Sequence, residues 1–206
     1  ENIRADAVDL LSAADFRSLA SVLGETLVAD VPVDVKPPVG PGRAWSLDEA
    51  TSVVGASLSG RNFAAGRNLF HATSCSSCHR FDGEGGAIGP DLTTVANKFS
   101  IDDLLEAIVE PNAAISDQYG SHLVLAKDGE IAEGILVEEE DSIVIYPRDV
   151  DEDPWVFERS EIQQIKESTT SQMPAGLVDA LNPEELRDLV AFLLAGGNEK
   201  AKVFQD

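Results

Sequence analysis

The chain has 206 residues, and 37 acidic side chains against 15 basic ones give it a formal net charge of −22 at pH 7. A surface with this charge repels phosphates, so the composition argues against a nucleic acid partner. Hydrophobic residues make up 43% of the chain, enough for a buried core, but no apolar run approaches the length of a membrane span. The excess charge serves solubility or steers a basic partner, and composition leaves both open.

The first 44 residues read as an extension of the main domain. Apolar residues recur at helical spacing over residues 1–30, which predicts helices there. Residues 31–43 hold four prolines and two glycines, which indicate an extended linker. We therefore expect a helical extension and linker over residues 1–44 and one domain over residues 45–206. Because the chain begins with Glu1, we also expect it to be a mature form or an excised piece.

Two helices are predicted at the start of the main domain. Ser46 and Glu49 form a capping box, so a helix should begin after Ser46. A second helix is expected over residues 62–72, with Phe63, Gly66 and Phe70 on one face. A glycine in mid-helix costs about 1 kcal/mol relative to alanine, so Gly66 indicates the close approach of another backbone.

The next segment carries the chemistry. Cys75 and Cys78 are the only two cysteines of the chain, and His79 follows the second one. This is the attachment pattern of c-type haem, in which both thiols form thioethers with vinyl groups and the histidine binds the iron. A redox dithiol needs no histidine at that place and usually follows a strand. A zinc site from His71, Cys75, Cys78 and His79 would require two adjacent residues to converge on one ion. The pattern therefore favours haem.

A glycine-rich loop and a further helix come next. Residues 83–92 contain enough glycine to lie flat against a large planar group, and they lack the Lys-Ser/Thr ending of a phosphate-binding loop. Ser100 should cap a helix that ends at Pro111.

From residue 121 the spacing of apolar residues changes from helical to an alternation of apolar and polar residues. Strands are expected at residues 123–125, 131–138, 142–146, 155–158 and 162–165. These segments predict a small antiparallel sheet or barrel, inserted over about residues 121–165.

The last helix and its approach segment offer a second iron ligand. Asn182 caps the helix, whose apolar face should meet the helix of Gly66 and Phe70 near Leu189 or Leu193. Before it lies Met173, the only methionine of the chain, in a polar loop. A thioether opposite a histidine raises the potential of a haem and suits electron transfer. His71 and His122 are the other candidates for this position, and the sequence favours Met173.

In this order the motifs resemble those of class I cytochromes c. The chain is more closely similar to the haem-binding cytochrome c domain of the planctomycete and verrucomicrobial type, over about residues 45–197. The first methionine of that family's frequent Met-Met-Pro motif is replaced here by Gln172. The stretches that carry the resemblance are residues 66–70, 75–81, 83–92, 104–111, 115–119 and 171–177.

The resemblance implies a mainly α, class I cytochrome c-like domain with a small antiparallel β insertion and an N-terminal helical extension. It also implies that the Pro90 carbonyl accepts a hydrogen bond from His79, so that Cys75, Cys78, His79, Pro90 and Met173 form the haem site with His79 and Met173 as iron ligands. Such domains commonly end a larger polypeptide, after dehydrogenase or helical-repeat sections.

The expected function is electron transfer through one covalent haem c, in the C-terminal electron-accepting module of a larger periplasmic redox protein. We expect no enzymatic activity, no nucleic acid, no membrane span and a redox partner with a basic docking face. Covalent haem attachment outside the cytoplasmic membrane is the chemical reason for the periplasm. Two alternatives remain: a haem enzyme or small-ligand sensor with an open or labile sixth position, and a partner-docking module built on the β insertion.

Overall fold

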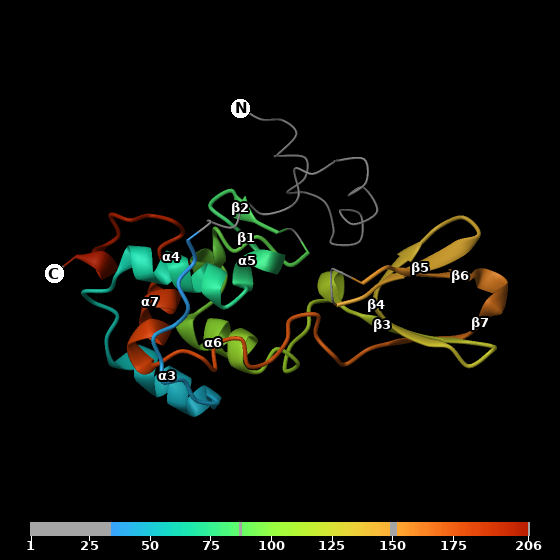
Figure 1. The fold of residues 1–206 in the computed structure, drawn as a ribbon, viewed down its shortest axis with the longest axis horizontal. Coiled ribbons are helices and arrows are strands. Elements are labelled where there is room, and N and C mark those ends of the chain that lie inside the picture. Colours follow the sequence, from blue (N-terminus) through green and yellow to red (C-terminus); the bar gives the residue numbers. More distant parts are fainter. Residues whose placement is uncertain (1–33, 87, 149–151, 206) are drawn as a thin grey trace. The chain divides into compact units, whose positions relative to one another are not determined.

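The computed structural model describes residues 34–86, 88–148 and 152–205 of the chain (Figure 1). The chain divides into two compact units. Within the described part, the helical unit comprises residues 34–113 and 175–205, and the β unit comprises residues 114–174. The helices predicted within residues 1–30 lie outside the described residues.

Each longer helix of the helical unit begins after a side-chain cap, and the sequence identifies three of these caps, at Ser46, Ser100 and Asn182. The side chains of Ser46, Ser100 and Asn182 each accept a backbone N–H and form a capping box, and Asn62 accepts from Ala65 N. These contacts satisfy N–H groups that have no partner within a helix. The helices are α3 (Leu47–Ala56), α4 (Phe63–Ala72), the single turn α5 (Cys75–Cys78), α6 (Ile101–Val109) and α7 (Pro183–Leu194), with short 3₁₀ turns η2 (Val95–Asn97) and η5 (Lys202–Phe204).

The crossing of α4 and α7 forms the centre of the helical unit. A Cβ atom at Gly66 would contact the Asp188 carbonyl oxygen and lie 2.6 Å from Phe192 Cβ. The predicted approach of another backbone is therefore present, one residue before the expected Leu189 and Leu193. The apolar face of α7 is buried as predicted, and its Phe192 packs against Phe81, with the ring centroids 4.6 Å apart and the rings tilted by 39°.

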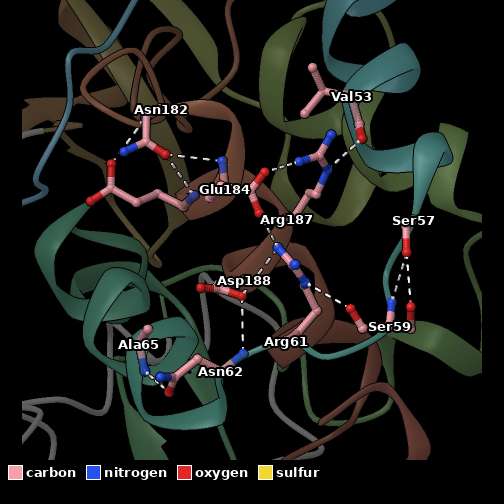
Figure 2. Close-up of polar contacts among 11 residues, drawn as sticks. Val53, Ser57, Ser59, Arg61, Asn62, Ala65, Asn182, Glu184, Arg187 and Asp188 are labelled. Carbon is pink, nitrogen blue, oxygen red and sulfur yellow. Dashed lines mark hydrogen bonds and ion pairs between the residues drawn. The ribbon is translucent and has the colours of Figure 1, made fainter. Parts of the chain in front are cut away.

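A polar network holds the ends of α4 and α7 together (Figure 2). Arg61 Nη1 lies 2.7 Å from Glu184 Oε2 and 3.7 Å from Asp188 Oδ1. Asp188 Oδ1 also accepts the Asn62 backbone N–H at 3.1 Å. Arg187 Nε donates to the Val53 carbonyl oxygen at 2.8 Å, which joins α7 to α3.

The described part of the expected linker lies along the helical unit. It contains no helix or strand, as the prolines predict. The Glu185 carboxylate accepts the backbone N–H groups of Val39 and Gly40, and the buried Trp45 donates its Nε1–H to the Leu181 carbonyl at 3.3 Å. Residues 34–45 therefore pack against this unit, while the domain boundary at residue 44 stays a prediction.

The β unit contains five antiparallel strands in the order β6-β5-β4-β3-β7. Its core is formed by inward side chains that include Val124, Ile143, Ile145 and Phe157. A register shift between Leu125 and Ala126 interrupts the β3–β7 pairing. The strands are β3 (His122–Ala126), β4 (Ile131–Glu138), β5 (Ser142–Tyr146), β6 (Trp155–Glu158) and β7 (Ile162–Glu167), and they lie where the alternation predicts them.

The expectation of a mainly α fold holds only in part. Of the described residues, 34% are helical and 19% are in strands. The helical unit fits the expectation, whereas the β unit forms a core of its own. The α-helices of the described residues therefore all lie in the helical unit, whereas the β unit is built mainly from strands.

The helix crossing predicts the effect of a methyl group at position 66. Gly66→Ala places a Cβ against Asp188 and Phe192, so the free energy of unfolding should fall by about 1–3 kcal/mol despite the better helix propensity of alanine. Chemical denaturation of the purified protein measures the change.

The matched control is Gly55→Ala in α3, where an added Cβ meets nothing within 4 Å. This variant should be as stable as the parent or up to about 1 kcal/mol more stable. Equal effects of the two substitutions would contradict the close crossing.

Candidate functional site

The two cysteines lie on one helical turn. Helix α5 spans Cys75–Cys78, and the His79 backbone N–H donates to the Cys75 carbonyl at 2.9 Å. Thr73 Oγ1 donates to the Leu69 carbonyl at 2.8 Å and lies 3.2 Å from Cys75 Sγ. The Thr73 hydroxyl proton is therefore engaged, and the Cys75 thiol is the donor in the second contact. The last hydrogen bond of this turn is made by His79, so the histidine is joined directly to the turn that contains both cysteines.

The His79 imidazole is held in one tautomer. Its Nδ1 lies 2.8 Å from the Pro90 carbonyl oxygen, the hydrogen bond that the resemblance implies. Because a carbonyl oxygen only accepts, Nδ1 carries the proton and Nε2 keeps its lone pair. Burial lowers the pKa of His79, against the opposing effects of the Pro90 carbonyl and the Asp91 carboxylate. The neutral imidazole favoured in this way is the form that binds a metal.

Gly89 leaves the space that the imidazole occupies. A Cβ atom at this position would lie 2.6 Å from His79 Cε1 and 2.8 Å from Nδ1. The Gly89 backbone N–H donates to the Cys78 carbonyl at 2.8 Å. Any side chain at residue 89 would therefore displace the ring from Pro90.

Two more glycines pack against the same segment. A Cβ atom at Gly85 would contact the His79 carbonyl oxygen, and one at Gly86 would contact the Ser77 carbonyl oxygen. The Gly86 N–H donates to the Ser76 carbonyl at 2.8 Å. The sequence suggests a loop that lies flat against a planar group; the structure places these glycines against the backbone of the cysteine turn.

A short hairpin returns the chain to His79, and the sequence analysis did not identify it. Strands β1 (Arg80–Phe81) and β2 (Glu84–Gly85) pair through a turn at Asp82 and Gly83. Both turn residues have positive φ, 50° and 82°. Asp-Gly is a preferred sequence for such two-residue turns, so this dipeptide was the available signal.

The alternative chemistries find less support in the geometry. Among the described residues no group of three or more His, Cys, Asp and Glu side chains could hold a metal ion, so the zinc site considered above is not formed. Burial raises the pKa of the Cys75 thiol, whereas reactive dithiols have lowered values. His71 is buried, and its Nδ1 lies 2.9 Å from Ser76 Oγ, which gives it a structural partner.

The remaining candidates for iron ligands lie in the β unit. Met173 is half-buried in the segment that follows β7, and His122 is half-buried at the start of β3. His122 Nδ1 is buried and has no hydrogen-bond partner among the described residues. Cys75, Cys78, His79 and Pro90 belong to the helical unit.

Residues 63–134 match the family model of cytochrome c. The match supports a c-type cytochrome. Proteins of the cytochrome c family transfer electrons through covalently bound haem c and exchange them with a redox partner. The match includes the cysteine turn and Pro90 and ends before Met173. No curated protein matches the chain. Within the described part of the chain, no helix has the length and apolar character needed to cross a membrane.

The glycine contact predicts a variant with a displaced imidazole. Gly89→Ala should push the His79 ring away from Pro90 and lower the free energy of unfolding by about 1–3 kcal/mol. The visible spectrum of the haem protein should change with it, because His79 is the expected iron ligand. Gly120→Ala is the control, since its Cβ would meet Asp117 O at an ordinary 3.6 Å and should change neither property. An unaltered Gly89→Ala spectrum and stability would contradict the contact.

The buried His71 predicts a dependence of stability on pH. Burial lowers the pKa of folded His71 below its ordinary 6.5, so below that pH the unfolded chain takes up a proton that the folded chain refuses. Stability should therefore fall as the pH drops below 6.5, and His71→Gln should reduce that slope.

Urea denaturation at about pH 7.5 and about pH 5.5 measures this slope. The visible spectrum of His71→Gln should equal that of the parent, because His71 is paired with Ser76. A changed spectrum would instead make His71 an iron ligand.

Proposed function

We propose that the protein is an electron carrier with one covalently attached haem c, bound by Cys75 and Cys78 and ligated by His79 and Met173. The observation that carries the proposal is the His79 imidazole, fixed by Pro90 and spaced by Gly89, directly after a turn with two cysteines. This arrangement leaves one nitrogen, Nε2, for the iron.

The residues of the helical unit fit this cofactor. Cys75 and Cys78 would hold the haem through thioether bonds, with each thiol hydrogen passing to the neighbouring vinyl carbon as the sulfur–carbon bond forms. The haem supplies a one-electron couple, while the chain supplies attachment at Cys75 and Cys78, ligation at His79 and a buried surround. The Pro90 carbonyl increases the basicity of the ligand and thereby influences the potential.

Met173 is proposed as the second ligand on chemical grounds. It is the only methionine of the chain and lies half-buried in a loop that polar contacts hold in place. A thioether ligand favours the reduced state and raises the potential, which suits an electron carrier. A core methionine would instead be expected within an element of regular structure, packed among apolar neighbours.

The wider setting follows from the resemblance and the charge. We propose the periplasm as the location, and the C-terminal electron-accepting module of a larger redox protein of the planctomycete and verrucomicrobial type as the role. The net charge of −22 suits a partner with a basic docking face, and electron-transfer interfaces are small and transient.

The ligand set predicts the effect of removing the thioether. The oxidised protein should show a thioether-to-iron charge-transfer band in the near infrared, and Met173→Ala should abolish it. The reduced parent should resist carbon monoxide, whereas Met173→Ala should bind it. His122→Ala is the control and should leave both properties unchanged.

A parent without the band, or one that binds carbon monoxide readily, would contradict His/Met ligation. If the parent lacks the band and His122→Ala loses the native spectrum, the ligand is His122. Rapid binding of carbon monoxide by the parent would favour a ligand sensor or a haem enzyme.

A further inference from the structure

Polar contacts hold the loop with Met173 to the start of strand β3. We propose that the β unit positions the Met173 thioether, and that Gln172 and Ser121 are the positioning pair. The proposal rests on Met173 as the iron ligand and assigns a role to the β insertion that the electron-carrier function leaves open.

The central contact joins residues that are 51 positions apart in the chain. Gln172 Nε2 donates to Ser121 Oγ at 2.6 Å. Ser121 is 2% exposed, so water does not compete for its hydroxyl group. If the amide were turned over, its oxygen would accept the hydroxyl proton instead, so either orientation keeps one hydrogen bond.

Ser121 is itself fixed by the sheet. Its carbonyl oxygen accepts the Ser168 backbone N–H at 2.8 Å, directly beyond the paired residues His122 and Glu167. The chain therefore enters and leaves the five-stranded sheet at the same place. The loop that contains Met173 begins at this junction, with Gln172 bonded across it.

Further contacts fix the loop on both sides of Gln172. Arg148 Nη2 donates to the Ser171 carbonyl at 2.7 Å, and the Met173 backbone N–H donates to Ser171 Oγ at 3.1 Å. Thr170 N donates to Ser168 Oγ at 2.9 Å, and that hydroxyl bonds to the Glu133 carboxylate of β4. All of these partners belong to the β unit.

The amide of Gln172 is kept at a cost in stability. Its Oε1 is buried and has no hydrogen-bond partner among the described residues. A buried acceptor without a partner is unfavourable, so packing alone would favour an apolar side chain at this position. The retained polar group is explained if it fixes the backbone of the adjacent ligand residue.

Fixing the loop has a direct consequence for ligation. A thioether is a weak ligand whose binding must offset the loss of loop freedom. A loop that the fold already holds loses less freedom on ligation, so the bound form is more populated. Without the Gln172–Ser121 hydrogen bond, Met173 should leave the iron more often.

Displacement of Met173 by added imidazole measures this population. The oxidised 206-residue protein is titrated with imidazole while the near-infrared band and the visible spectrum are followed, the visible spectrum alone for Met173→Ala. Gln172→Ala and Ser121→Ala should each raise the apparent affinity for imidazole about five- to tenfold, as expected for one lost hydrogen bond. Ser121→Thr keeps the hydroxyl group and should bind imidazole as the parent does.

Two controls separate positioning from general stability. Gln164→Ala removes an exposed glutamine from β7 and should change nothing. Ile143→Val should destabilise the core of the β unit about as much as the loss of a hydrogen bond without touching the loop, and its imidazole affinity should equal the parent's. Parent-like binding by Gln172→Ala, or an equal increase in Ile143→Val, would overturn the positioning role.

The failure of this inference is distinguishable from failure of the proposed function. If the parent shows the band, Met173→Ala abolishes it and Gln172→Ala titrates like the parent, only the positioning role falls. If the parent lacks the band, or Met173→Ala binds imidazole no more tightly than the parent, Met173 is not the ligand and both proposals fall.

Discussion

The hydrogen bond from His79 Nδ1 to the Pro90 carbonyl is the contact on which the candidate site depends. It fixes the tautomer of the imidazole and leaves Nε2 as the one nitrogen for a metal. To make this bond, the chain must return to the cysteine turn at close range. The Asp82-Gly83 hairpin turns it back, and Gly89 leaves the space for the ring. The glycines of the loop thus serve the close return of the chain to the cysteine turn and, at Gly89, the space for the His79 ring.

The two units supply different parts of the proposed chemistry. The helical unit contains the cysteine turn, His79 and Pro90, and the crossing of α4 and α7 at Gly66 gives it a rigid centre. The β unit contains Met173 and a hydrogen-bonded junction that holds the adjacent residue. A histidine ligand next to two covalent cysteine attachments needs one fixed ring, whereas a weak thioether ligand needs a loop that is ordered before it binds. Under the proposed function, this difference gives a physical reason for a chain that matches the cytochrome c family model also to contain the sheet.

Much of this fold was predictable from the sequence because local chemistry determines it. Contacts between residues far apart in the chain were not predictable. The caps at Ser46, Ser100 and Asn182 are local signals, so the helix starts were correct, and the alternation after residue 121 located the five strands. The histidine bond to Pro90 came from the family resemblance rather than from spacing. The contact of Gly89 with an imidazole and the pairing of Gln172 with Ser121 carry no local signature, because each depends on how the chain returns. The sequence likewise did not predict that the β unit has a hydrophobic core of its own, since a list of strands does not show which side chains they enclose.

The most direct test of the central claim is the intact mass of the denatured protein. The chain should be produced in a host that attaches haem outside its cytoplasmic membrane. The account predicts the mass of the polypeptide plus one haem, retained after extraction with acidified acetone and lost when both Cys75 and Cys78 are replaced by serine. An intact parent chain with the bare polypeptide mass, although the host loads another c-type cytochrome, would contradict covalent attachment and with it the electron-carrier function.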